Sequence, residues 1–173
     1  MHPKRRAVLK ASVFTGFCAF LLVITAARSF HLPAAPALII CYVLLLVATY
    51  FSVRCFDSIT PPHDPIQIIL DLVLGALYVC IAWSVGDPGL FTLAMTAMFS
   101  LSVIKYALIL ETKHFRVVRR KVFFNALGTV FCLAATVGVR LWDPVLVTSL
   151  WTAGFALAHA YLLFVRPLYR LDA

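Results

Sequence analysis

Six long apolar runs separated by short polar connections constrain this chain more than any other feature of its sequence. The runs cover about residues 8–28, 36–54, 66–85, 89–110, 122–140 and 145–165. A hydrocarbon core about 30 Å thick is crossed by roughly 20 helical residues, at 1.5 Å per residue. Each run therefore predicts one transmembrane helix. The expected fold class is all-α, a polytopic membrane protein with a six-transmembrane-helix bundle built from three antiparallel helical hairpins.

Composition excludes the main alternatives to a membrane fold. Hydrophobic residues make up 63% of the chain and charged residues 13%, whereas soluble domains carry roughly 45–50% and about 25%. The five cysteines form no CxxC pair, so a secreted disulfide scaffold does not fit. The first run is longer than the apolar core of a signal peptide, and we expect a transmembrane anchor there. Residues 1–173 are thus expected to form a single integral membrane domain.

Helix boundaries are marked by characteristic residues. Asp64-Pro65, Asp87-Pro88 and Asp143-Pro144 each place an N-cap acceptor before a proline at the first helical position. Three helices are expected to end near a cation that suits the negative end of the helix dipole, at Arg54, Arg140 and Arg166.

The distribution of basic residues predicts the orientation of the bundle. With a cytoplasmic N-terminus, the outside loops hold two cations, Arg28 and Arg140. The inside segments hold twelve: Lys4, Arg5, Arg6, Lys10, Arg54, Lys113, Arg116, Arg119, Arg120, Lys121, Arg166 and Arg170. The positive-inside rule then predicts that both termini are cytoplasmic. We expect the protein in a cytoplasmic membrane, such as the bacterial inner membrane.

The connection 111–121 concentrates many of these cations. Its basic residues are expected to contact anionic lipid headgroups along the inner surface, each gaining about 1 kcal/mol; they are Lys113, Arg116, Arg119, Arg120 and Lys121. Membrane lipids are therefore the expected partners. Nucleic acid is not expected, although the formal net charge is +8.

Four polar residues within the spans define a candidate site: Asp71, Lys105, Asn125 and His159. Counting from the helix ends at 1.5 Å per residue places all four in one layer, about 6–10 Å from the cytoplasmic side. Ionisable groups in a span cost about 2.5–3.5 kcal/mol on insertion scales, so they are hypotheses for a functional site.

Each of these residues also has a structural interpretation. Lys105 can snorkel to the surface, or pair with Asp71 across the hairpin within about 4 Å, or serve in binding or proton transfer. His159 can be a hydrogen-bonding helix contact or a ligand. Helical spacing turns the small and polar faces of the third, fifth and sixth helices inward. On the fourth helix, Thr92 and Thr96 project nearly opposite to Lys105. Lys105 is therefore expected to face either a different neighbouring helix or a subunit interface.

An internal match suggests that hairpins are repeated. Residues 87–101 and 143–157 share Asp-Pro-x-Leu-x-Thr followed by Thr-Ala-x-Phe-x-Leu, without gaps. The last two hairpins are therefore candidates for copies of one unit, although Asp-Pro is also a generic helix start.

Sequence motifs for catalysis and cofactors are scarce. The spans contain one histidine, so a haem pair is not expected, and no usual zinc or iron spacing occurs. GxSxG, HExxH and glycine-rich phosphate loops are missing as well. The polar connection 54–65 fits a stiff turn better than a metal site. We expect no cofactor and no metal, and an enzyme is the least favoured class.

Two function classes remain. The first is a non-catalytic membrane subunit or scaffold, with a protein partner or a second copy. The second is a channel or transporter component for a small solute or ion, with a cytoplasm-facing polar site. A central proline is the usual mark of a carrier site, and no span contains one. This favours a subunit or a simple channel-like bundle over an alternating-access carrier. A water-filled cavity reaching Asp71 and His159 would instead favour the solute-binding class.

Overall fold

The computed structural model describes residues 3–57, 64–110 and 115–165, and this part of the chain is all-helical. Its elements are α1 (Pro3–Ser29), α2 (Ala35–Phe56), α3 (Pro65–Trp83), α4 (Pro88–Ala107), α5 (Phe115–Leu141), α6 (Pro144–Ala160) and the π-helical turn η1 (Tyr161–Val165). The predicted all-α, six-helix fold class is confirmed.

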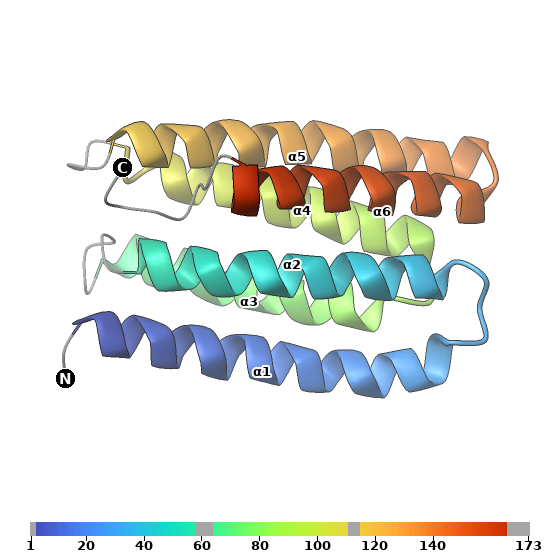
Figure 1. The fold of residues 1–173 in the computed structure, drawn as a ribbon, viewed down its shortest axis with the longest axis horizontal. Coiled ribbons are helices and arrows are strands. Elements are labelled where there is room, and N and C mark those ends of the chain that lie inside the picture. The colour runs from blue at the N-terminus through green and yellow to red at the C-terminus, as the bar shows by residue number, and fades with distance from the viewer. Residues whose placement is uncertain (1–2, 58–63, 111–114, 166–173) are drawn as a thin grey trace.

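The helices pack as a closed ring in the order α1, α2, α6, α5, α4, α3, with α3 returning to α1. Figure 1 shows that α1, α3 and α5 begin at the end where α2, α4 and α6 finish. We call this the cavity end. The opposite end, where Asp87 and Asp143 begin α4 and α6, is the capped end.

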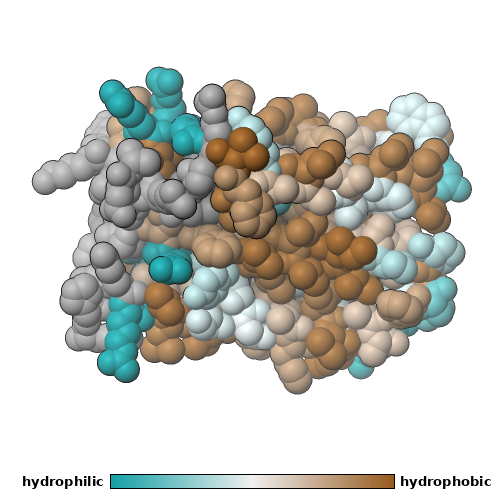
Figure 2. Space-filling model, viewed as in Figure 1, coloured by the Kyte–Doolittle hydropathy of each residue, from teal (hydrophilic) through white to brown (hydrophobic). Residues whose placement is uncertain are grey.

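All six helices are long and apolar enough to cross a membrane. Large apolar side chains on their outer faces are well exposed, among them Phe17, Leu72 and Leu157. Figure 2 shows apolar residues over the middle of one face, with polar residues toward both ends. This distribution is typical of a protein whose central belt contacts lipid rather than water.

The predicted N-caps are confirmed. The carboxylates of Asp64, Asp87 and Asp143 accept backbone N–H bonds from Ile66, Leu90 and Leu146, at 2.9, 3.0 and 2.8 Å. Each bond satisfies one of the otherwise unpaired donors in a first helical turn. Arg54 and Arg140 lie in the last turns of α2 and α5, as expected, while Arg166 lies outside the described residues.

Close helix contacts around α5 depend on glycine. A Cβ atom at Gly128 of α5 would lie 2.8 Å from the Phe99 ring of α4, and one at Gly154 of α6 would lie 2.9 Å from the Phe131 ring of α5. The hydrophobic effect does not drive helices together inside a bilayer, so their association depends on close packing. Small residues such as glycine allow this packing because the backbones can approach closely. α5 is thus joined to α4 and α6 by two ring-on-glycine contacts.

The predicted inward faces are buried. Tyr78 and Ala82 of α3, Cys132 and Thr136 of α5, and Thr148 of α6 are all at most 8% exposed. On α4, Thr92 and Thr96 were predicted to project nearly opposite to Lys105. The packing explains this, because α4 lies between α3 and α5. Its two sides are both covered within the chain, and Lys105 pairs with Asp71 of α3.

Two helix starts differ clearly from the sequence prediction. α1 begins at Pro3, not near residue 8, and α5 begins at Phe115, not near residue 122. The apolar run marks only the stretch suited to the hydrocarbon core, whereas a helix satisfies its own backbone and continues into the polar layer. Residues 115–121 are therefore the first turns of α5, not a connection along the surface, and Lys113 lies outside the described residues.

Candidate functional site

A cavity of about 180 Å³ lies inside the ring at the cavity end. All six helices line it, with Lys10 from α1, Ser52 from α2, Asp71 from α3, Lys105 from α4, Lys121 and Asn125 from α5, and His159 from α6. One water molecule needs only about 10–15 Å³ of such volume. The cavity is therefore large enough for several waters or one small solute.

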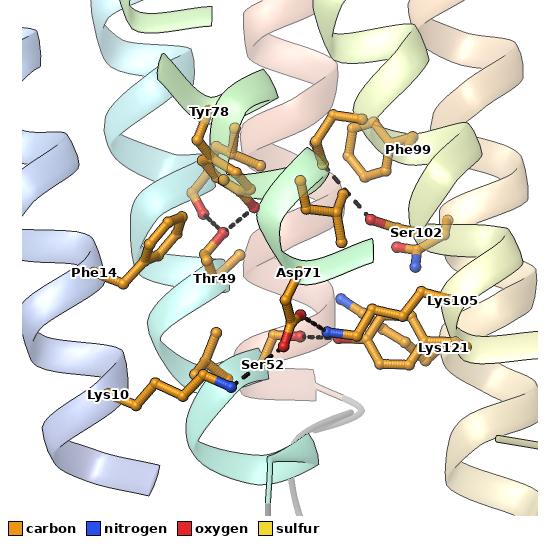
Figure 3. A pocket seen from close by; sticks show the side chains of 18 of the residues that line it. Lys10, Phe14, Thr49, Ser52, Asp71, Tyr78, Phe99, Ser102, Lys105 and Lys121 are labelled. Carbon is orange, nitrogen blue, oxygen red and sulfur yellow. Dashed lines mark hydrogen bonds and ion pairs between the residues drawn. The ribbon is translucent and has the colours of Figure 1, made fainter. Parts of the chain in front are cut away.

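A chain of alternating charges crosses one side of the cavity. The Lys105 ammonium pairs with one carboxylate oxygen of Asp71, and Lys10 Nζ lies 3.3 Å from the other. Lys10 Nζ also lies 2.6 Å from Asp57 Oδ1. Figure 3 shows Asp71 between the two lysines, which reach it from opposite sides. These ion pairs tie α1, α3 and α4 to the C-cap of α2.

The contact predicted between Asp71 and Lys105 is therefore present. The Lys105 side chain is 14% exposed, so it does not snorkel to the surface. Removing two charges from water is costly unless they pair and are hydrogen-bonded. Asp71 meets this condition twice, because it accepts from both lysines.

The structure brings all four predicted site residues to this one cavity. Asn125 is 3% exposed, and its Nδ2 amide nitrogen has no hydrogen-bond partner among the residues that the structure describes. His159 Nδ1 lies 2.9 Å from the Phe155 carbonyl oxygen. Because a carbonyl can only accept, Nδ1 carries a hydrogen and Nε2 is the remaining polar atom of that ring.

Lys121 requires a correction to the sequence interpretation. We expected it among the cations that contact lipid headgroups, but its side chain lines the cavity. Its ammonium lies 5.5 Å from the centre of the Tyr106 ring, and the Lys105 ammonium lies 5.7 Å from the same ring. Two cations thus share one aromatic neighbour, and Tyr106 in turn bonds Ser52 of α2 across 3.0 Å.

Uncharged groups line the inner part of the cavity. The hydroxyls of Thr49 and Tyr78 form a hydrogen bond, and the Tyr42 hydroxyl donates to the Tyr78 carbonyl at 2.9 Å. Apolar side chains surround this group: Phe14, Leu45, Leu74, Met98 and Phe99. The cavity therefore has a charged part and an apolar part, as Figure 3 shows for its labelled residues.

Lys10, Lys121 and Asp57 are the charged residues of the site that the sequence analysis did not assign to it. Lys10 lies seven residues after the start of α1, and Asp71 and Lys121 lie six after the starts of α3 and α5. Because α1, α3 and α5 run in the same direction, Lys10, Asp71 and Lys121 lie at about the same depth in the bundle. This equal spacing from the helix starts could have indicated the shared depth. It was not visible in the sequence analysis because the helix starts were taken from the apolar runs.

No group of three or more His, Cys, Asp or Glu side chains suited to a metal occurs in the described part of the chain. The cavity instead offers ammonium and amide donors beside one carboxylate. Such groups bind and orient a polar ligand through hydrogen bonds and charge.

No family model, curated protein or solved structure matches this chain.

Proposed function

We propose that this protein binds a small polar solute in the central cavity, as a component of a membrane channel or transporter. The observation that carries the proposal is a cavity of about 180 Å³ lined by all six helices. Membrane bundles place ligand sites between facing helices, lined by the few ionisable groups that their spans contain. The cavity reaches both Asp71 and His159, which supports solute binding over a closed scaffold.

The polar lining argues against a simple packing defect. Dry voids in protein interiors are apolar, whereas polar cavities hold water or a ligand. The lining of this cavity includes three lysines, one aspartate and the Asn125 side chain. Such polar groups favour a cavity filled by water or a ligand over an empty one.

The orientation of the site is part of the proposal. The excess of cations at the cavity end supports a cytoplasmic position for this end, as in a bacterial inner membrane. Arg116 and Arg119 are exposed on the first turns of α5, where they suit anionic lipid headgroups. The solute would then enter from the cytoplasm.

Solvent access to the cavity tests the proposal. Ser102 lines the cavity and is 8% exposed, whereas Thr148 is fully buried at the capped end. In a chain whose five cysteines are replaced by alanine, Ser102→Cys should react readily with a small charged thiol reagent. Thr148→Cys, the matched control, should react only on unfolding. Equally slow reaction of both cysteines, in variants with native unfolding midpoints, would contradict the proposal.

A membrane subunit or scaffold is the second candidate function. It is favoured by the helices themselves, because in the described residues the prolines of α2, α3, α4 and α6 lie at helix starts and leave the spans unbroken. Alternating-access carriers often use broken helices instead. A dry cavity together with stable co-purification of a protein partner or a second copy would support this function.

A further inference from the structure

The ion pairs at the cavity end form one series in which the charges alternate and balance. Two carboxylates and two ammonium groups follow one another, in the order Asp57, Lys10, Asp71 and Lys105. Lys121, whose ammonium lies near the Tyr106 ring, is not a member of this series. A solute with a net charge would disturb the balance within an apolar bundle, where an unbalanced charge is expensive.

The contact between Lys10 and Asp71 is the link of the series that can open. Lys10 Nζ lies 2.6 Å from Asp57 and 3.3 Å from Asp71, so it keeps a carboxylate partner when it leaves Asp71. The Lys10 side chain is 47% exposed and the Asp71 side chain 35%. A lysine ammonium on its flexible stem can move while its helix stays in place. Because both residues line the cavity, the opened link lies beside the solute.

The groups next to this link, farther into the bundle, are small or apolar. Phe14 lies four residues after Lys10 on α1, and Gly75 lies four residues after Asp71 on α3, so each is about one turn deeper. A Cβ atom at Gly75 would lie 3.8 Å from the Phe14 ring, and the missing side chain leaves room beside that ring. Figure 3 shows Phe14 between Lys10 and Tyr78. A small apolar body fits here, next to two opposite charges.

We infer that the cavity binds a small zwitterion, of the class of α-amino acids with an apolar side chain, at the link between Lys10 and Asp71. The ligand's ammonium group replaces Lys10 at Asp71, and its carboxylate binds the released Lys10 ammonium. Its apolar body lies against Phe14 and beside Gly75. The charges then still alternate, and the net charge of the site is unchanged. The inference rests on the proposed function and names the class of solute.

Two sources provide a neighbouring ammonium and anionic group, a free amino acid and the headgroup of phosphatidylethanolamine. Purified protein is placed in nanodiscs of phosphatidylcholine, whose quaternary ammonium donates no hydrogen bond, and is titrated with L-valine and with L-leucine. Isobutylamine is valine without its carboxylate, and isovalerate is valine without its ammonium group. Binding is followed by equilibrium dialysis with labelled ligands and by the unfolding midpoint.

We expect valine or leucine to bind saturably and to raise the unfolding midpoint, because a ligand of the native state stabilises it by mass action. Isobutylamine and isovalerate should each bind at least tenfold more weakly. A second set of nanodiscs also contains phosphatidylethanolamine. Competition with valine there would add the headgroup as a source, and unchanged valine binding would assign the free amino acid. Both results support the zwitterion.

Two variants change the charge of the series in opposite directions. Lys10→Met removes the partner of the ligand carboxylate and leaves Asp71 for a cation. Valine should then bind at least tenfold more weakly, and isobutylamine at least threefold more tightly than to the unaltered protein. Asp57→Asn leaves one carboxylate beside two ammonium groups, so isovalerate should gain at least threefold. A loss of folding cannot produce these opposite gains.

The matched control is Arg6→Met, because Arg6 is exposed and lies one turn before Lys10 on α1. It removes a positive charge from the same helix and should leave the binding of all four ligands unchanged. A gain of isobutylamine binding in Arg6→Met equal to that in Lys10→Met would attribute the effect to the general charge of this end and overturn the assignment to the link.

The outcomes separate this inference from the proposed function. Tighter binding of isobutylamine or isovalerate than of either amino acid would overturn the zwitterion and leave solute binding intact. An unchanged order of ligands in both Lys10→Met and Asp57→Asn would overturn the assignment to the link between Lys10 and Asp71. A reactive Ser102→Cys together with no binding of either amino acid would also reject the zwitterion, whereas an unreactive cysteine together with no binding would reject both.

Discussion

α4 and α6 begin alike and end differently. At the capped end, Asp87 and Asp143 form equivalent N-caps, and Thr92 and Thr148 each return a hydroxyl bond to the proline that follows the cap, at 2.9 and 2.7 Å. Both threonines are fully buried. The shared sequence pattern of the two segments is therefore also a shared local structure.

Farther along, the equivalent side chains meet and then diverge. Phe99 and Phe155 pack edge to face with ring centres 6.2 Å apart. Beyond them α4 presents Ser102 and Lys105, whereas α6 presents Ala158 and His159 and is followed by Tyr161 of η1. Lys105 pairs with Asp71 of another helix, but His159 bonds within its own helix to Phe155. The repeated part supports packing, and the charged cavity is built where the repeat stops.

The largest expected loss of stability follows from removing the Asp71 carboxylate, which pairs with two lysines. Asp71→Asn leaves Lys105, with a side chain 14% exposed, without its carboxylate. Breaking a buried pair costs about 3–5 kcal/mol, and the partial exposure of Asp71 reduces this to about 2–3 kcal/mol. Lys105→Met should cost less, because Asp71 retains Lys10. Unfolding midpoints in detergent measure both.

Exchanging the two residues sharpens this test. In an isolated pair, Asp71→Lys with Lys105→Asp would preserve folding. Here Lys10 lies 3.3 Å from Asp71, so the exchanged lysine faces a like charge, and we expect only partial recovery. Full recovery would show that Lys10 contributes nothing to the network.

The next effect compares the two glycine contacts of α5. Gly128→Ala places a methyl group 2.8 Å from Phe99, which is 9% exposed, and overpacking of this kind costs about 1–3 kcal/mol. Gly154→Ala meets only the far atom of Phe131, which is 39% exposed and free to shift. It should cost less. Gly16→Ala, with open space around it, is the control and should be neutral or stabilising. Equal losses at 128 and 154 would contradict this ranking.

Local patterns in the sequence predicted local structure well. Asp-Pro pairs act within a few residues, so the N-caps at Asp64, Asp87 and Asp143 follow from the sequence alone. The back-bonds of Thr129 and Thr136 to their own helix, at 3.1 and 2.9 Å, follow for the same reason. The contact of Asp71 with Lys105 was within reach because a tight hairpin fixes the register of two neighbouring helices.

Contacts between distant helices were not predictable in this way. Lys10 reaches Asp57 and Asp71 across 47 and 61 residues, and Ser52 reaches Tyr106 across 54. These contacts depend on the order of helices around the ring, which hydrophobic periodicity does not specify. α1 must lie between α2 and α3 before Lys10 can bridge them.

The N-caps give a smaller and symmetric prediction. Asp87→Ala and Asp143→Ala each remove one capping bond at the start of α4 or α6, with an expected loss of about 1 kcal/mol. Because the two caps are equivalent, their costs should be similar, and the double variant should show their sum, as for independent sites. Unfolding midpoints measure the three variants, and Asp87→Asn and Asp143→Asn, which retain an acceptor, are the controls. A cost at one cap several times that at the other would show that the repeated segments are not energetically equivalent.

The smallest expected effect on stability concerns Thr96 and Thr152, which occupy equivalent positions in the repeated segments but form different hydrogen bonds. Thr96 returns its hydroxyl to Thr92 of its own helix at 2.8 Å, whereas Thr152 donates to the Ala37 carbonyl of α2 at 3.1 Å. Hydrogen bonds between membrane helices contribute about 0.6 kcal/mol on average, while a back-bond within a helix adds little. Thr152→Val should therefore lower stability by about 0.6 kcal/mol and Thr96→Val by almost nothing, measured by reversible unfolding in mixed micelles. Because valine keeps the size and branching of threonine, a larger loss at Thr96 would show that its hydroxyl has a role outside its own helix.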